Sequence, residues 1–195
     1  MVRVAISVEG ETEESFVKTV LSPHLQSSEV FVTPINMRGS ISVKKAVEEI
    51  KKLVHGFEYV TTLYDFYGFK GNTGYDKDGL ENAILEGVPV DKKNVVQPYV
   101  QMYEYEGILF SDPKIMSSVV KETKSGWAKS VLEKFNNSPE TINNSTETAP
   151  SKRLEKNTDY KKTLHGPLIA EKIGIPKIKE MCPNFKAWVE QLENL

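Results

Sequence analysis

The sequence contains a single cysteine, Cys182, among 195 residues. One thiol can form neither an internal disulfide nor a zinc site of several cysteines, and this scarcity is typical of proteins from a reducing compartment. We therefore expect a cytoplasmic protein. Histidine is nearly as scarce, and the spacing of His24, His55 and His165 matches no zinc motif.

Long apolar runs and an excess of charge are also missing. The apolar stretches are far shorter than the roughly 20 residues that span a bilayer, so we expect no membrane association. The first residues show a strand pattern and lack the pattern of a signal peptide. The net charge of −2 provides no general attraction for polyanions. A nucleic acid would therefore need a local basic patch or a metal ion.

The opening stretch, residues 2–12, combines a strand with an acidic turn. Glu9 would end the strand, Gly10 permits a sharp turn, and Thr12 can cap a helix whose first turn is acidic. The apolar residues of the strand alternate and would share one face: Val2, Val4, Ile6 and Val8.

The remainder of the first half repeats this alternation of strand and helix. Such an order predicts an α/β fold with a mostly parallel, four-stranded sheet flanked by helices. The further predicted strands are 29–35, 58–65 and 94–103, and the predicted helices are 12–21, which Pro23 would end, 42–55 and 78–85.

The second half indicates a helical C-terminal extension. We predict one domain, with residues 1–112 as the α/β core and residues 113–195 as an extension packed on it. Residues 136–156 are polar and predict a surface loop with little regular structure. The predicted helices begin at Asp112-Pro113, include 127–135, and end the chain with 167–173, 176–181 and 184–192.

Carboxylates follow three of the predicted strands. Glu9 ends the first, Asp65 ends the third, and Glu104 and Glu106 follow the fourth. The carboxyl ends of parallel strands meet at one edge of a sheet, where ligands bind. A hard divalent cation, Mg²⁺ or Mn²⁺, would offset the repulsion among these oxygens. Alternatively, the acids are helix caps and solvated turn residues.

Basic residues in two loops are candidate phosphate ligands. Lys152 and Arg153 follow Pro150, and Lys70 lies in the glycine-rich segment 68–74, which lacks the ending of a phosphate-binding P-loop. Surface charge in polar loops is the alternative. Three tyrosines near the acids can either stack on bases or pack in the core: Tyr99, Tyr103 and Tyr105.

The stretch Val8-Glu9-Gly10-Glu11-Thr12-Glu13 resembles the opening motif of the Toprim fold, which topoisomerases, bacterial primases and overcoming-lysogenization-defect nucleases share. That resemblance implies that Glu9 is the lead glutamate and Asp65 the first acid of the second motif. Four segments in order also resemble a bacterial family filed as domain of unknown function 4276, across essentially the whole chain: 64–68, 103–112, 149–154 and 182–188. The resemblance implies a context of partner ATPases and phage defence.

One position departs from the Toprim pattern. The second motif usually has two aspartates one residue apart, and here Tyr67 stands in the second place. A two-metal mechanism would then need Glu104 or Glu106 as a replacement ligand, with Glu106 preferred.

We predict a nuclease that uses Mg²⁺ or Mn²⁺ to cleave DNA or RNA, in phage defence or DNA repair. Glu9, Asp65 and Glu106 would be catalytic, and Glu104 would be a further metal ligand. A non-catalytic effector or binding subunit of a partner ATPase is the alternative, and a small-molecule phosphotransfer enzyme is a third. The expected partners are nucleic acid, the ATPase and, as a further option, a second copy of the chain.

Overall fold

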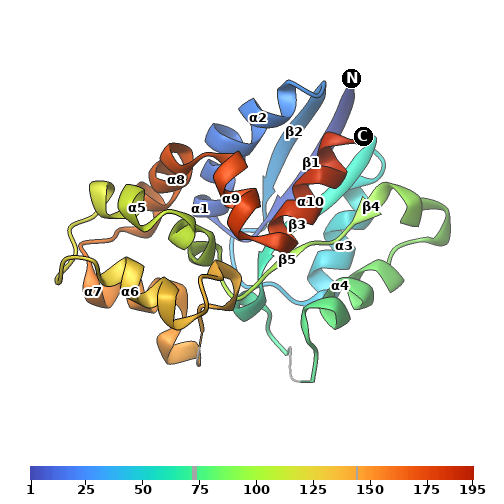
Figure 1. Cartoon of the computed structure of the whole chain (residues 1–195). Coiled ribbons are helices and arrows are strands. Elements are labelled where there is room, and N and C mark those ends of the chain that lie inside the picture. Colours follow the sequence, from blue (N-terminus) through green and yellow to red (C-terminus); the bar gives the residue numbers. More distant parts are fainter. Residues whose placement is uncertain (72–73, 144) are drawn as a thin grey trace.

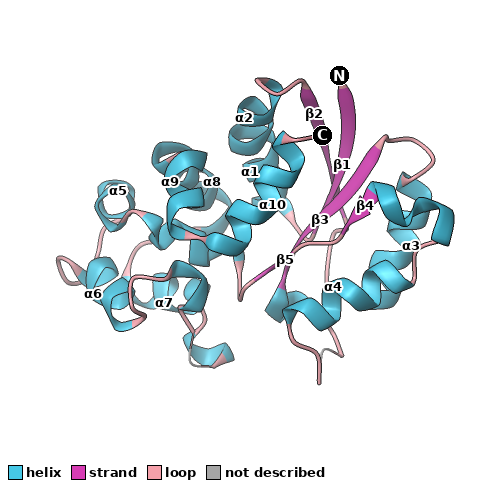
Figure 2. Cartoon of the chain, turned by 45° about the vertical axis from the view of Figure 1, so that its right-hand side comes forward, coloured by secondary structure: helices cyan, strands magenta, loops and turns pink. Residues whose placement is uncertain are grey.

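The computed structural model describes residues 1–71, 74–143 and 145–195. Within these residues a five-stranded parallel sheet lies between layers of helices (Figures 1 and 2). The strand order is β2-β1-β3-β4, and β5 also pairs with β3. The strands are β1 (Val2–Val8), β2 (Val30–Asn36), β3 (Tyr59–Asp65), β4 (Val96–Gln97) and β5 (Val100–Gln101). The predicted α/β class with a parallel sheet is confirmed.

The predicted fourth strand is interrupted and forms both β4 and β5. Pro98 separates them and has no N–H to donate to the ladder. Both pieces still pair in parallel with β3, β4 beside Val60 and Thr61 and β5 beside Tyr64 and Asp65. The break shortens the strand without changing its direction, so its carboxyl end lies beside that of β3.

The alternation of β1 divides the core into two layers. Val4, Ile6 and Val8 point into a large apolar cluster that includes the C-terminal helices. Ala5 points to the opposite side, into a smaller cluster. The apolar residues of β1 therefore share one face, as the alternation predicts. The other face of β1 is buried as well.

Different helices cover the two faces of the sheet. The smaller cluster contains α3 (Val43–Leu53) and α4 (Lys77–Glu86), and Ser42 caps α3 by accepting a hydrogen bond from the N–H of Lys45. On the opposite face α10 lies against β3, and α5, α6 and α7 extend away from the sheet (Figures 1 and 2). The larger cluster draws on α1 (Glu11–Phe16), α5 (Pro113–Val119), α6 (Trp127–Lys134), α7 (Pro150–Asn157), α8 (Lys162–Ile173), α9 (Ile175–Met181) and α10 (Pro183–Glu193).

Two predicted helix boundaries near prolines are wrong. The first helix does not end before Pro23, because a π-helical turn, Val17–Leu21, leads into α2 (Ser22–Gln26), and Pro23 lies in the first turn of α2. The helix predicted to start at Pro167 starts at Lys162 instead, with Pro167 in its interior.

The predicted polar loop 136–156 is only partly irregular. It contains short 3₁₀ turns at Pro139–Thr141 and Thr146–Thr148, and its end forms most of α7. Pro150 fits the first turn of α7, where its missing N–H costs no hydrogen bond. The next N–H, that of Ser151, donates to Oε2 of Glu104 at 2.8 Å. This long-range contact explains why local composition did not predict the helix.

The last helix ties the C-terminal part to the central strand. Trp188 of α10 is buried, and its Nε1 donates to Oγ1 of Thr61 in β3 at 2.8 Å. Its ring stacks on Tyr99 with a centroid distance of 4.5 Å and an interplanar angle of 6°. The second half is thereby fixed against the sheet. In the described part of the chain, no helix has both the length and the apolar character that a membrane span requires.

Candidate functional site

The parallel register brings the ends of β1 and β3 to one edge of the sheet. Val8 pairs with Leu63, so Glu9, which follows β1, lies level with the end of β3. Asp65 is the last residue of β3 and pairs with Gln101 of β5. The structure therefore places Glu9 and Asp65 at the same edge.

Glu106 joins this edge from a buried 3₁₀ turn, Tyr105–Ser111. Its side chain has no exposed surface, and its Oε1 accepts a hydrogen bond from the hydroxyl of Tyr160 at 3.2 Å. The N–H of Tyr105 donates to Oδ1 of Asp65 at 2.6 Å. This bond joins the turn that carries Glu106 to the end of β3.

Lys162, the first residue of α8, lies among these acids and was missed by sequence reasoning. Its Nζ is 3.4 Å from Oε1 of Glu106 and 3.9 Å from Oδ2 of Asp65. The sequence pattern predicted that α8 starts at Pro167, and that prediction placed Lys162 in a connecting segment. The signal that remained was a pair of lysines, Lys161 and Lys162, directly after Tyr160.

Glu13 is the second residue that the prediction missed. It was interpreted as a first-turn acid that stabilises the helix dipole, and its Oε2 does accept a hydrogen bond from the N–H of Gly10 at 3.1 Å. However, its side chain is only 3% exposed, and its Oε1 lies 3.9 Å from Nζ of Lys162. One carboxylate therefore both caps α1 and faces the acidic cluster. We use "carboxylate cluster" for Glu9, Glu13, Asp65 and Glu106.

Glu9 lies closely against the turn that follows β3. Its Oε2 is buried and makes no hydrogen bond within the described residues. A Cβ placed on Gly68 would lie 1.9 Å from this oxygen. Glycine is therefore needed at position 68 so that the backbone can approach the carboxylate.

Burial and crowding raise the pKa values of Glu9, Asp65 and Glu106. Burial, reinforced by Glu13, raises the pKa of Glu9 to about 7. Burial also raises the pKa of Glu106 to about 7, against the opposing effect of Lys162. The pKa of Asp65 is raised by burial and then by the charge of Glu13. These three acids therefore keep their protons to a higher pH than exposed carboxylates do.

Lys162 remains charged in this setting. Burial opposes its charge, but the carboxylates of Glu106, Asp65 and Glu13 outweigh that effect and raise its pKa above the ordinary value. The side chain of Lys162 is 42% exposed, and the neighbouring carboxylates stabilise its charge. Lys162 is thus a permanent cation at neutral pH.

The donor atoms of the cluster fit a hard divalent cation in their chemistry. All are carboxylate oxygens, the type that Mg²⁺ and Mn²⁺ prefer. Two of them, Oε2 of Glu9 and Oε2 of Glu106, are buried and have no hydrogen-bond partner among the residues that the structure describes. In the described residues, no three Asp, Glu, His or Cys side chains are positioned to hold a metal ion at once. Lys162 lies between the acids that would have to approach one another.

The other predicted site residues lie outside the cluster. Oε2 of Glu104 accepts a hydrogen bond from the N–H of Ser151 in the first turn of α7. Lys152 forms an exposed ion pair with Glu155, with 2.9 Å between Nζ and Oε2. Nε of Arg153 donates to the carbonyl of Thr148 at 2.6 Å, and its guanidinium lies over the ring of Phe135.

Lys70 lies just beyond the turn 66–68, where its N–H donates to the carbonyl of Ile41 at 2.8 Å. Its side chain is exposed. Part of the predicted glycine-rich loop, residues 72–73, falls outside the described residues. The three tyrosines near the acids differ in burial: Tyr99 and Tyr105 are buried, whereas Tyr103 is partly exposed.

An open cavity gives access to the cluster. It has a volume of about 360 Å³ and is lined by Glu9, Glu13 and Lys162. A second cavity of about 480 Å³ adjoins the first and shares the lining residues Gly10 and Gly39 with it. The cluster is therefore reachable by a ligand larger than a single ion.

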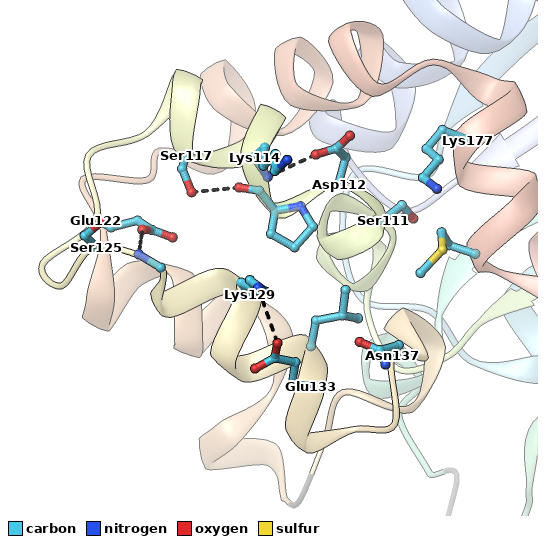
Figure 3. Close-up of a pocket in the computed structure, with 14 residues that line it drawn as sticks. Ser111, Asp112, Lys114, Ser117, Glu122, Ser125, Lys129, Glu133, Asn137 and Lys177 are labelled. Carbon is cyan, nitrogen blue, oxygen red and sulfur yellow. Dashed lines mark hydrogen bonds and ion pairs between the residues drawn. The ribbon is translucent and has the colours of Figure 1, made fainter.

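A larger cavity of about 650 Å³ lies among α5, α6 and α9. Figure 3 shows that several of its polar side chains interact with the surrounding helices: Asp112 caps α5, and Lys129 pairs with Glu133. None of the described residues that line it belongs to the carboxylate cluster. We therefore assign the candidate site to the edge of the sheet.

Comparison with known proteins supports the fold. The family model described as "Domain of unknown function (DUF4276)" matches residues 8–193. The structure is similar to the C-terminal region of the Burkholderia pseudomallei OLD protein, with a TM-score of 0.53, 16% identity and coverage of 99% of both chains. The C-terminal region of the Xanthomonas campestris pv. campestris OLD protein gives a TM-score of 0.48 and 12% identity, covering 98% of this chain and 94% of the other. No curated protein sequence matches this chain.

Proposed function

This chain belongs to the family described as domain of unknown function DUF4276, and from that premise we propose that it is a Toprim-like nuclease that uses Mg²⁺ or Mn²⁺ to cleave DNA or RNA. We further propose that residues 1–112 are the catalytic core and residues 113–195 the helical extension. The proposal includes a cytoplasmic setting and a role in phage defence or DNA repair.

The convergence of the carboxylate cluster around Lys162 carries this proposal. Acids from the ends of two strands, from α1 and from the turn 105–111 face one lysine from α8. Helix capping accounts for Glu13 but not for the burial of Asp65 and Glu106. Buried carboxylates with raised pKa values in a cleft are typical of functional sites.

Glu9, Glu13, Asp65 and Glu106 are the residues that would hold the ion, once their side chains rearrange around it. A divalent cation bound there would supply Lewis acidity and lower the pKa of a water molecule. The unpartnered oxygens of Glu9 and Glu106 support this assignment, because each has coordination capacity that no hydrogen bond uses.

The chain's own groups suit phosphodiester hydrolysis. In that reaction a water oxygen bonds to phosphorus, the bond from phosphorus to one sugar oxygen breaks, and the departing oxygen takes up a proton. If Glu9 does not itself coordinate the ion, its carboxylate can instead accept the proton of the attacking water, because a base with a pKa near 7 suits neutral pH. The ammonium of Lys162 would stabilise the negative charge on the phosphoryl oxygens.

Contacts to the substrate backbone would come from outside the cluster. Lys70, Lys152 and Arg153 are the proposed phosphate ligands, as the sequence predicts. Lys70 and Lys152 are exposed and can reorient, whereas Arg153 would have to release the carbonyl of Thr148. We expect Arg153 to contribute less than the two lysines.

The experiment is a cleavage assay with single-stranded and duplex DNA and RNA, in Mg²⁺, Mn²⁺ or EDTA. Glu9→Gln and Asp65→Asn should abolish metal-dependent cleavage. Asp91→Asn, an exposed acid on the 3₁₀ turn Val90–Val95, is the matched control and should retain it. If the wild type cleaves none of these substrates with either metal, the nuclease proposal is wrong.

A non-catalytic effector or binding subunit of a partner ATPase is the second candidate. Two observations favour it: Tyr67 stands where the Toprim pattern has an acid, and Lys162 already supplies a cation to the acids. Calorimetric titration with Mn²⁺ separates the candidates. Binding by the wild type that Asp65→Asn removes supports the enzyme, and the absence of binding supports the subunit.

A further inference from the structure

An aromatic group borders the candidate site on the side of β3. Phe66, Tyr67 and Tyr103 contact one another, and all three are partly exposed. The rings of Tyr67 and Tyr103 have centroids 5.4 Å apart and an interplanar angle of 32°. Phe66 meets Tyr103 edge-on at 6.1 Å. We call these three residues the aromatic platform.

The platform and the carboxylate cluster share the same backbone segments. Phe66 directly follows Asp65, and the turn that contains Tyr67 ends at Gly68, which lies against Oε2 of Glu9. The N–H of Tyr67 donates to the carbonyl of Tyr103 at 3.2 Å. The platform is therefore adjacent along the backbone to Asp65 and to the turn that packs against Glu9.

Core packing does not account for the two tyrosines of the platform. Tyr99 stacks on Trp188 and Tyr105 packs on Phe16, and both are buried. Tyr67 and Tyr103 belong to neither apolar cluster of the described residues, whereas Phe66 packs against the smaller one. The tyrosine rings are therefore available to a ligand.

The platform is held in position before a ligand binds. The hydroxyl of Tyr67 accepts a hydrogen bond from Nδ2 of Asn143, and its backbone is bound to Tyr103. Phe66 supports Tyr103 from the core side. A ring that is fixed in this way loses little conformational entropy when a base stacks on it.

We infer that Tyr67 and Tyr103 stack on an unpaired nucleobase beside the phosphate at the carboxylate cluster, so that the site selects single-stranded over duplex nucleic acid. This inference rests on the proposed function and adds a substrate class to it. In a duplex both faces of a base are covered by its neighbours, whereas an unpaired base offers a free face to an aromatic side chain. Lys70, exposed just beyond the turn 66–68, would contact the adjoining backbone phosphate.

The test is fluorescence anisotropy with a labelled single-stranded oligonucleotide and its duplex, in EDTA and separately in Ca²⁺. Tyr67→Leu and Tyr103→Leu should each weaken single-strand binding about 5-fold or more and leave duplex binding unchanged. Tyr103→Phe keeps the ring and should bind as the wild type does. Phe31→Ala removes an exposed ring from the amino end of β2, at the opposite end of the sheet, and is the control.

The inference is overturned if the leucine variants bind single strands normally, if they lose both strand types equally, or if the wild type binds neither. Its failure is distinct from failure of the nuclease proposal. Ring-dependent binding without cleavage would refute the nuclease and retain the platform. If the wild type cleaves nucleic acid but the leucine variants bind single strands normally and keep the wild-type KM, the nuclease proposal is retained and the platform is refuted.

Discussion

Nζ of Lys162 lies 3.4 Å from Oε1 of Glu106, a carboxylate with no exposed surface. The hydroxyl of Tyr160 donates to the same oxygen, so this atom joins the segment before α8 to the turn 105–111. The pair shows how the helical part of the chain completes a cluster whose other members belong to the α/β part.

Replacing Lys162 with methionine tests its role in catalysis. If the cluster hydrolyses phosphodiesters, Lys162→Met should lower kcat by about 10²–10³-fold, the usual cost of removing one group that stabilises transition-state charge. A steady-state cleavage assay measures this effect. Lys161→Met, the neighbouring exposed lysine, should cleave at the wild-type rate.

The same variant should also destabilise the metal-free protein, because it leaves Asp65 and Glu106 without their cation. Because the side chain of Lys162 is 42% exposed and solvent screens its charge, we expect a loss of about 1–2 kcal/mol in the free energy of unfolding, measured with urea in EDTA. Added Mn²⁺ should restore part of it if the ion binds the same carboxylates. An unchanged free energy would show that Lys162 does not offset their charge.

Gly68→Ala should displace Glu9. The added Cβ would meet Oε2 of Glu9 at 1.9 Å, a distance that requires the carboxylate or the turn to move. Affinity for Mn²⁺, measured by calorimetry, should fall by more than about 10-fold, the scale seen when the support of a metal ligand is lost. Gly56→Ala is the control, because its Cβ would find its nearest neighbour at 4.0 Å.

The stability of the metal-free protein should fall between pH 5 and pH 8. Folding raises the pKa of Glu9 and of Glu106 from 4.5 to about 7, so the unfolded chain loses these protons first. Their contribution is therefore complete below about pH 4.5 and is lost as the pH rises through 7. Solvent screening reduces the effect at the partly exposed Glu9, and we expect the Tm to drop by roughly 3–8 °C in total.

Differential scanning calorimetry in EDTA measures this drop. Glu106→Gln should flatten the profile, since an amide does not titrate, while Glu180→Gln on the exposed side of α9 should not. A Tm that stays level or increases over this range would contradict the raised pKa values.

Trp188→Phe should loosen the attachment of α10 to the sheet. The variant loses the hydrogen bond to Thr61 and part of the stacking on Tyr99, both in the core. Loss of one buried hydrogen bond and part of an aromatic contact should cost about 2–3 kcal/mol in urea unfolding. Trp127→Phe, at the partly exposed start of α6, should cost less. Equal costs would mean that this contact is not what holds α10.

Local patterns predicted the sheet well and the site only in part. Alternation along β1 and the strand-like segment ending at Asp65 predicted buried parallel strands, because periodicity directly reflects which face is covered. The start of α8 was misplaced because Pro167 usually marks a first turn, and here tertiary packing holds it inside the helix.

The misplaced start of α8 also removed Lys162 from the candidate residues. Glu13 was overlooked for a different reason: a favourable interaction with the helix dipole already explained an acid in the first turn. Both residues reach the cluster through contacts between distant segments, and no local pattern encodes such contacts. The roles predicted for Glu9, Asp65, Glu104, Glu106, Lys70, Lys152 and Arg153 stay predictions until the variants are measured.

The order of Lys162 and the four acids along the chain has a consequence for protein synthesis. The ribosome makes Glu9, Glu13, Asp65 and Glu106 well before it makes the lysine that lies among them. A growing polypeptide therefore cannot assemble the complete constellation until α8 has emerged and docked. During synthesis a finished site therefore exists only on polypeptides that extend beyond α8, and products truncated before Lys162 would carry the acids without their counter-charge.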